Sequence, residues 1–165
     1  MNNWTPQTIK SWTAGIIDGE GYVTIQKCTK GRYGRRDYLT TKIRVGNTDM
    51  KMVDMLQLVW GGNVRFRKRG GNRRDIYEWD IQCTQARRVL ESILPYSITK
   101  KKQMELAINF QKRVSNREGL HYQEGSRGVL MSEKEWNIRY EMYGQMRKLN
   151  RTGRTIEKIA DIVKR

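Results

Sequence analysis

Histidine and cysteine are scarce in this chain of 165 residues. There is one histidine, His121, and there are two cysteines, Cys28 and Cys83. Two distant cysteines without metal-ligand spacing exclude a zinc ribbon and a disulfide framework. The single histidine, which we expect at the surface, excludes nucleases that need two or more histidines and argues against a Ser-His-Asp or Cys-His catalyst.

Several recognisable segments are also missing. No G-x-x-x-x-G-K stretch is present to cradle phosphates, which argues against an NTPase. No apolar run approaches the ~20 residues of a membrane span. The first residues have neither the apolar stretch of a signal peptide nor the Arg-rich character of a transit peptide. We therefore expect no membrane partner, no small-molecule cofactor and an intracellular location, either the cytoplasm or nucleoid or an organelle that holds the nucleic acid.

Positive charge is what the chain has in excess. Lysine and arginine number 33 against 17 acidic residues, giving a net charge of +16 and a pI near 10.1. Such a balance could serve solubility alone or the RNA binding of a ribosomal-type protein. A domain that neutralises many phosphates is the sharper interpretation. Despite a mean hydropathy of -0.82, the hydrophobic content of 37%, with five Trp and eight Tyr, predicts one folded domain over 1–165.

Helical and alternating patterns follow one another twice. Thr5 and Pro6 are a typical N-cap and first helical residue. The next helix follows the capping run 47–49 and ends at the glycine pair 61–62. The predicted elements are a helix over 7–18, strands over 22–28 and 38–45, a helix after 49, strands over 64–67 and 77–82, helices over 84–93 and 99–114, a loop over 116–128, and helices over 132–149 and 155–164.

This order predicts an α+β fold. Each hairpin has an apolar face and a polar face and is followed by helices, so the two hairpins should form a four-stranded antiparallel sheet backed by helices. The core should cover about 5–115, and about 116–165 should form a helical C-terminal annex to the same domain.

The polar face of the sheet is the candidate contact surface for DNA. It combines cations with Thr, Gln, Tyr and acidic side chains, which can pair with base edges, and the basic hairpin loops could reach phosphates. An ordinary solvated face is the alternative that composition alone leaves open. The candidate DNA-binding residues are Tyr22, Thr24, Gln26, Cys28, Lys30, Arg32, Tyr33, Arg35, Tyr38, Thr40, Lys42, Arg44, Arg65, Arg67, Arg69, Arg73, Arg74, Glu78 and Asp80.

The most informative segment is 13–21, TAGIIDGEG. Gly15 and Gly19 lie one turn apart on one helix face, where a second helix could pack closely. Asp18 and Glu20 stand where this helix gives way to a strand. For a phosphodiester, the remaining chemistry is a hard divalent metal held by carboxylates, with lysine or arginine supporting the transition state.

This segment resembles the LAGLIDADG signature of homing endonucleases. Ala14, Gly15, Ile17, Asp18 and Gly21 match the namesake letters, and Ile16 is conservative for Leu. Thr13 departs from Leu, and Glu20 replaces the last Asp while keeping a carboxylate. The order of the following elements, αββαββα over about 5–115, is also that of the family.

The resemblance implies site residues. Glu20 would be the metal-ligating acid, with the Gly19 carbonyl as a further ligand of Mg²⁺ or another hard cation such as Mn²⁺. Asn47 would organise water, and Lys51 and Lys100 would stand near the scissile phosphate, with Lys102 a rival for the role of Lys100. The alternative for each lysine is a solvated helix face or a simple phosphate contact.

A single copy of the motif implies a homodimer. The expected interface residues are Ala14, Gly15, Asp18 and Gly19, although Asp18 should mainly hydrogen-bond at the end of its own helix. A plain helix contact within one subunit is the alternative for the glycines. Each protomer would bring Glu20 to a two-fold site on double-stranded DNA.

The expected function is therefore a site-specific, metal-dependent double-strand break in a long pseudo-palindromic site, promoting the homing of an intron or similar element. Two other functions stay open. One is a non-cleaving binder on the same scaffold, such as an RNA maturase or a transcription regulator, and the other is a basic ribosomal-type protein.

Overall fold

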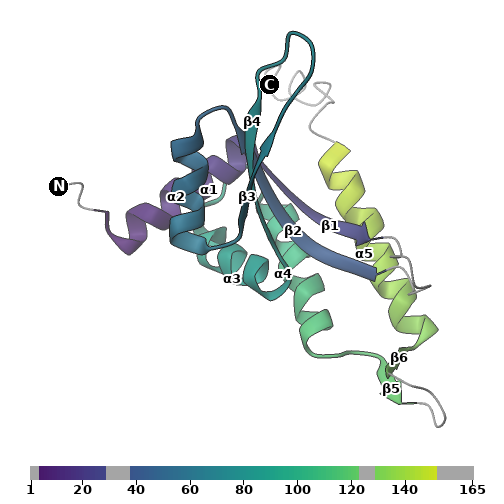
Figure 1. The fold of residues 1–165 in the computed structure, drawn as a ribbon. Coiled ribbons are helices and arrows are strands. Elements are labelled where there is room, and N and C mark those ends of the chain that lie inside the picture. Colours follow the sequence, from purple (N-terminus) through teal and green to yellow (C-terminus); the bar gives the residue numbers. More distant parts are fainter. Residues whose placement is uncertain (1–3, 29–37, 123–128, 152–165) are drawn as a thin grey trace, which may run out of the picture.

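The computed structural model describes residues 4–28, 38–122 and 129–151 (Figure 1). Its elements along the chain are α1 (Pro6–Glu20), β1 (Gly21–Cys28), β2 (Tyr38–Asn47), α2 (Met50–Trp60), β3 (Asn63–Arg67), β4 (Ile76–Gln82), α3 (Cys83–Ile93), the 3-10 turn η1 (Leu94–Tyr96), α4 (Lys101–Ser115), β5 (Leu120–Tyr122), β6 (Val129–Met131) and α5 (Glu133–Arg151).

The predicted α+β fold is confirmed. β1 to β4 form one antiparallel sheet in the order β1-β2-β4-β3, so β2 and β4 are central and β1 and β3 are the edges. Helices α1 to α4 pack on one side of this sheet, and α5 runs beside the edge strand β1 (Figure 1). No helix among the described residues is both long and apolar enough to cross a bilayer.

The two ends of α1 are set by local chemistry. Thr5 accepts a hydrogen bond from the amide of Thr8 at 3.1 Å, and Pro6 occupies the first turn, as the sequence predicts. At the other end, a Cβ on Gly21 would lie 2.6 Å from the backbone of Ile17. Only glycine lets β1 leave so directly from the end of α1, which fixes where the two acids of the motif stand.

The core lies between the sheet and α1 to α4. Val23, Ile43 and Val45 are fully buried on one face of β1 and β2, as the alternating pattern predicts. Trp79 of β4 is also fully buried, and its indole nitrogen donates to the carbonyl of Gly61 at 2.7 Å. The neighbouring Gly62 has a positive φ of 89°, and a Cβ there would lie 2.7 Å from the carbonyl oxygen of Asp80. These glycines therefore end α2 and bring β3 against β4.

Two features of the C-terminal half differ from the sequence predictions. Residues 116–128, predicted as a loop, include β5, which pairs with β6 beyond the undescribed stretch 123–128. Three-residue strands are too short to show an alternating pattern. His121 lies on β5 and is exposed, as expected. The helix predicted over 155–164 lies outside the described residues.

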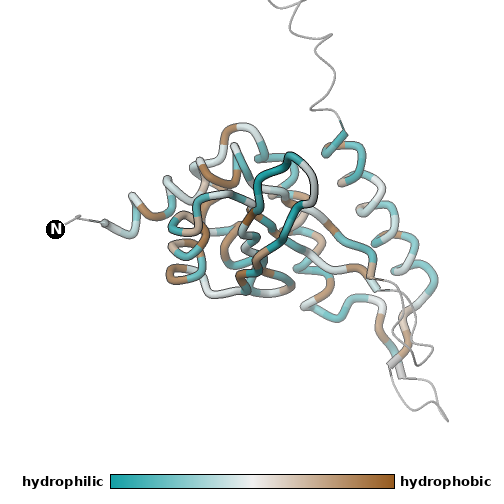
Figure 2. The backbone as a smooth tube through the Cα atoms, turned by 45° about the horizontal axis from the view of Figure 1, so that its top comes forward, coloured by the Kyte–Doolittle hydropathy of each residue, from teal (hydrophilic) through white to brown (hydrophobic). Residues whose placement is uncertain are grey.

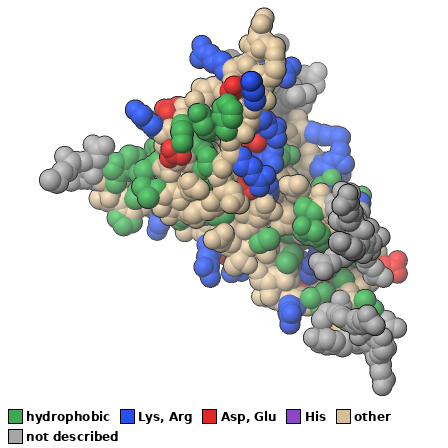
Figure 3. Space-filling view, viewed as in Figure 1, with side chains coloured by type: hydrophobic (Ala, Val, Ile, Leu, Met, Phe, Trp, Pro, Cys, Tyr) green, Lys and Arg blue, Asp and Glu red, His purple; other side chains and the backbone are tan. Residues whose placement is uncertain are grey.

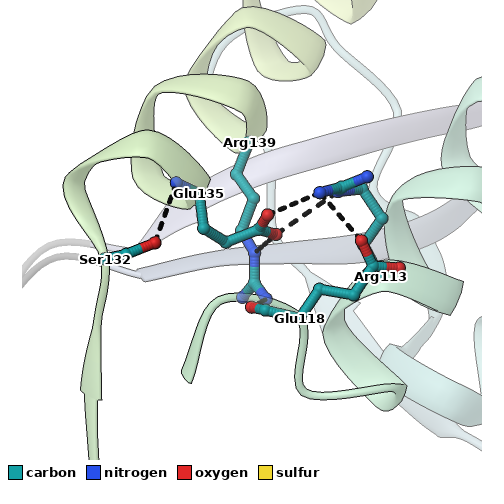
Figure 4. A network of polar contacts seen from close by, with 5 residues as sticks. All are labelled: Arg113, Glu118, Ser132, Glu135 and Arg139. Carbon is teal, nitrogen blue, oxygen red and sulfur yellow. Dashed lines mark hydrogen bonds and ion pairs between the residues drawn. The ribbon is translucent and has the colours of Figure 1, made fainter. Parts of the chain in front are cut away.

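A buried ion cluster fixes α5 to α4. The carboxylate of Glu135 accepts hydrogen bonds from Arg113 of α4 and, at 2.7 Å, from Arg139 one turn along α5 (Figure 4). Ser132 caps α5 by accepting from the amide of Glu135 at 3.2 Å, at the residue where the sequence predicts this helix to begin. Hydrophilic residues prevail along α5 and at the tip of the β3–β4 hairpin (Figure 2). Polar contacts therefore contribute more to holding α5 in place than they do in the apolar core.

Candidate nucleic-acid interface and catalytic end

The predicted catalytic residues are placed at one end of the sheet. Gly21 pairs with Val45, so Glu20 at the end of α1 and Asn47 at the end of β2 lie at the same sheet end. Glu20 is exposed. Asn47 accepts from the amide of Asp49 at 2.8 Å, and Lys51 follows in the first turn of α2 with an exposed side chain.

Asp18 joins α1 to the start of α4. Its carboxylate accepts from the amides of Ile98 at 2.6 Å, Thr99 at 3.2 Å and Lys100 at 3.1 Å, and from the Ser97 hydroxyl at 2.8 Å. Burial alone would raise the pKa of this carboxyl, but the hydrogen bonds outweigh it and the pKa is lowered. The predicted hydrogen-bonding role of Asp18 at the helix end is confirmed.

Lys100 is anchored at the same helix end. Its ammonium donates to the carbonyl of Ile17 at 2.9 Å and to that of Asp18. Partial burial lowers the pKa of Lys100, while the charges of Asp18 and Glu20 oppose this shift. Lys100 is thus anchored at the end of α1 that also carries Glu20. The rival residue, Lys102, is exposed on α4 and has no such anchor among the described contacts.

Two of the motif glycines face away from the other described residues. Gly15 and Gly19 are exposed, and a Cβ added to either meets no atom within 4 Å among the described residues. The alternative of a helix contact within one subunit is therefore wrong for that part of the chain. Ala14, by contrast, was predicted to lie in the dimer interface, and the structure does not support this position. It is fully buried in the protomer's own core beside Ile17, because a helix rotates by about 100° per residue and turns position 14 inward.

One protomer brings together few metal ligands. Among the described residues, no group of three or more His, Cys, Asp or Glu side chains is arranged to hold a metal ion. Asp18 is occupied by hydrogen bonds, which leaves Glu20 as the exposed acid of the motif. A hard cation at this helix end would need Glu20, a backbone carbonyl and ligands from outside the protomer.

The polar face of the sheet is less open than the sequence predicts. Tyr22, Tyr38, Arg65 and Arg67 are exposed, but Thr24, Thr40, Lys42 and Asp80 are buried, so these four candidate DNA-binding side chains are not open to solvent in the free protein. Gln26, Cys28, Arg44 and Glu78 are half-buried, and Arg69, Arg73 and Arg74 are exposed around the second hairpin turn. Lys30, Arg32, Tyr33 and Arg35 lie outside the described residues.

Ion pairs explain part of this burial. Asp80 lies 3.3 Å from Lys42 on the neighbouring strand and 3.7 Å from Arg65. Glu78 lies 3.4 Å from Arg67. Lys and Arg side chains gather around the β3–β4 hairpin with acidic side chains between some of them (Figure 3). The acids expected to accept from bases are thus already paired with cations in the free protein.

α5 contributes to this surface in a way that the sequence patterns did not predict. Asn150 donates to the carbonyl of Val23 at 3.1 Å, which satisfies one acceptor on the outer edge of β1. Arg147, one turn before Asn150, and Tyr143, two turns before it, line the same face together with residues of β1 and β2. The basic run 147–154 was the available signal, but it does not say which element it contacts.

Comparisons with solved structures give the class of fold. The chain superposes on the homing endonuclease I-CvuI in complex with DNA with a TM-score of 0.57 and 20% identity, over 86% of this chain and 96% of that one. I-SmaMI bound to uncleaved DNA gives a TM-score of 0.63 and 16% identity, over 88% and 46% of the two chains.

A third similar structure is the group I intron-encoded homing endonuclease I-CeuI complexed with DNA, with a TM-score of 0.58 and 17% identity over 85% and 66%. The fold is therefore that of homing endonucleases, including ones named for the LAGLIDADG motif. No protein-family profile matches the chain, and no curated protein matches its sequence. At these identities the likeness concerns the fold.

Proposed function

We propose that this protein is a single-motif LAGLIDADG homing endonuclease that acts as a homodimer and cuts both strands of a long, pseudo-palindromic DNA site. The observation that carries the proposal is the end of α1. There an exposed Glu20 follows two open glycines on a fold shared with DNA-bound homing endonucleases. Because I-CeuI is described as encoded by a group I intron, intron homing is the proposed biological role.

The outward face of α1 supports the dimer. Open glycines allow two helices to approach closely, and large exposed apolar side chains occur on the neighbouring elements. Ile98, whose amide is held by Asp18, is 87% exposed, and Leu58 of α2 is 82% exposed. The chain aligns with 46% of I-SmaMI, so two copies would approximate that whole chain. A second copy would also bring a second Glu20, the ligand that one protomer lacks.

In the proposed mechanism, Glu20 and the carbonyl of Gly19 would hold Mg²⁺ or Mn²⁺. When bound, such a cation activates water and stabilises the leaving oxygen. Lys100 is held by carbonyls at the end of α1 and offsets negative charge near Glu20 and the phosphate. Asn47 and Lys51, at the same sheet end, orient water and contact the scissile phosphate.

The rest of the sheet would bind the duplex. Exposed arginines on β3 and around the hairpin turn neutralise phosphates, and half-buried polar side chains of β1 such as Gln26 contact base edges. Binding on this basis weakens steeply with salt, because each neutralised phosphate releases counterions.

Cleavage of a supercoiled plasmid library with Mg²⁺ tests the proposal. The wild-type protein should linearise plasmids that carry its site, and sequencing of the ends gives that site. Glu20→Gln should abolish cutting and keep DNA binding, whereas Glu133→Gln, which changes an exposed acid on α5, should cut normally.

Three outcomes would each contradict a part of the proposal. Cutting by Glu20→Gln would remove Glu20 from the site. Tight binding without a cut in any sequence context would favour the non-cleaving alternative, a maturase or a regulator on the same scaffold. Sedimentation of the protein on its DNA should give two protomers per site, and cleavage of both strands by a monomer would exclude the symmetric arrangement.

A further inference from the structure

A recess lies between the sheet and α5, on the face proposed to meet DNA. Its volume is about 330 Å³. The floor consists of side chains of β1 and β2, and one wall consists of α5. The lining residues that matter here are Tyr22, Thr24, Lys42, Arg44, Tyr143 and Arg147.

The recess is positively charged. Lys27, Lys42, Arg44 and Arg147 line it, and among the described lining residues none is acidic. Lys42 is balanced by Asp80 at 3.3 Å, so it contributes less to the field. The excess charge therefore comes mainly from Arg44 on the floor and from Arg147 on the wall.

The wall is held in place from both ends. Asn150 donates to the backbone of Val23 near one end of β1, and the Lys27 ammonium lies 5.7 Å from the ring centre of Tyr140 near the other. Met146 between them is fully buried. The guanidinium of Arg147 lies 5.8 Å from the ring centre of Tyr143, which supports its planar group from one side. A cation held in this way is partly pre-organised for an anion.

We infer that this recess binds a phosphate group of the DNA backbone, with Arg147 and Arg44 as the principal cations that pair with it, and that α5 thereby forms the outer wall of the DNA-binding surface. The inference rests on the proposed function, since DNA must lie on this face of the sheet. A backbone phosphate suits the chemistry because guanidinium groups pair with phosphate oxygens in a bidentate manner. It also explains why α5 presents arginine and tyrosine beside strands that carry the candidate base contacts.

The test is the salt dependence of binding to a mixed-sequence duplex of about 40 base pairs, with Ca²⁺ in place of Mg²⁺ to limit cleavage. Arg147→Gln should lower the magnitude of the slope of log K against log salt by about 0.9 for each phosphate that is no longer neutralised, or about 1.8 for a dimer with two recesses. Lys134→Gln removes the same charge from an exposed position on α5 outside the recess and should leave the slope nearly unchanged. Arg147→Lys should retain most of the wild-type slope.

Equal slopes for Arg147→Gln and Lys134→Gln, in a wild-type protein that binds with a steep slope, would overturn the inference and leave the proposed function standing. A large reduction of this slope in Arg147→Lys would also overturn the inference. Lysine keeps the positive charge, so the cause would then be the packing of Arg147 on Tyr143. A wild-type protein without salt-dependent duplex binding would instead refute the proposed function itself.

A second arm separates backbone phosphate from a free nucleotide. AMP at millimolar concentration should not shift the amide resonances of β1 and α5 beyond the effect of equal ionic strength. Micromolar AMP binding that Arg147→Gln abolishes, without a change in the DNA slope, would make the recess a small-molecule site and would overturn the inference.

Discussion

The motif end of the molecule and the α4–α5 junction both contain clamped carboxylates, but their surroundings differ. At the junction, Glu135 is 3% exposed, and its charge is satisfied by arginines of the same chain. At the motif end, Asp18 is satisfied in the same way by amides, whereas the adjacent Glu20, Gly15 and Gly19 are exposed. The difference separates residues that hold the fold from residues left available for a partner, a metal or DNA.

The largest expected effect comes from adding a side chain to the exposed glycine face of α1. Gly15→Leu adds a side chain where a Cβ meets no atom within 4 Å among the described residues, so the isolated fold should survive and gain about 0.8 kcal/mol of helix propensity. The same side chain should block close helix packing and abolish dimer formation and cleavage. Sedimentation and thermal unfolding together measure the two effects.

Gly144→Leu is the matched control. It places the same side chain at a half-buried helical glycine on α5 where an added Cβ likewise meets no atom within 4 Å among the described residues. This variant should remain dimeric. If Gly15→Leu also remained dimeric and active, the open face of α1 would not be the interface.

The second largest effect comes from removing the buried carboxylate at the α4–α5 junction. Glu135→Ala leaves Arg139, whose side chain is 7% exposed, without its carboxylate, and Arg113 loses the same partner. Breaking a buried pair in this way should cost about 3 kcal/mol of unfolding free energy. Urea unfolding measures it, and Glu141→Ala, an exposed acid on the same helix, should cost less than about 0.5 kcal/mol.

Replacing Asp18 should cost less unfolding free energy than replacing Glu135, because the amides that Asp18 binds lie close to solvent. In Asp18→Asn an amide must replace a charged acceptor for the amides of Ile98, Thr99 and Lys100, at a cost of about 1–2 kcal/mol. Hydrogen exchange at these amides should accelerate. Asp49→Asn is a graded comparison, since that carboxylate accepts from the amide of Lys51 alone among the described contacts, and the loss should be smaller.

The two clamped carboxylates also predict how stability depends on pH. For Glu135, burial would raise the pKa, but hydrogen bonds from Arg113 and Arg139 lower it, and the pKa of Asp18 is lowered by its donors. A lowered folded-state pKa means that the unfolded chain binds protons first as pH falls, so both contributions are present above about pH 4.5 and are lost below it.

Unfolding free energy measured from pH 6 to pH 3 should therefore decrease, by at most about 1.4 kcal/mol per pH unit for each carboxylate. Glu135→Gln should flatten this dependence, and Glu141→Gln should not. A wild-type profile that is level over this range would contradict the lowered pKa values.

The fold was predictable because its determinants are local. Thr5, Pro6 and the glycines at 21, 61 and 62 mark where elements begin and end, and alternation in β1 and β2 separates the two faces. The hydrogen-bonding role of Asp18 followed from its place at a helix end. Asn47, Lys51 and Lys100 as catalytic residues remain predictions from resemblance, although the structure places Lys100 near Glu20.

What the sequence could not supply depends on contacts between distant segments. The burial of Lys42 requires Asp80, which lies on a strand that is neighbouring in space but distant along the chain. The recess requires α5 to lie beside β1, and no periodicity encodes that position. Ala14 is a different case, since the helical phase that turns it inward was available from the sequence.

Thr13, where the motif departs from leucine, is expected to give the smallest effect. Although it lies on the motif helix, its side chain faces the protomer's interior. It is fully buried, donates to the carbonyl of Ile9 at 2.8 Å and accepts from the indole nitrogen of Trp60 at 3.0 Å. Thr13→Val keeps the shape and removes both bonds, so we expect a loss of about 1 kcal/mol with normal cleavage. A double-mutant cycle with Trp60→Phe should give a coupling of about 0.5–1 kcal/mol. Zero coupling, or a loss of cleavage without a loss of stability, would contradict a purely structural role for Thr13. It would then belong with the residues available for a partner, a metal or DNA.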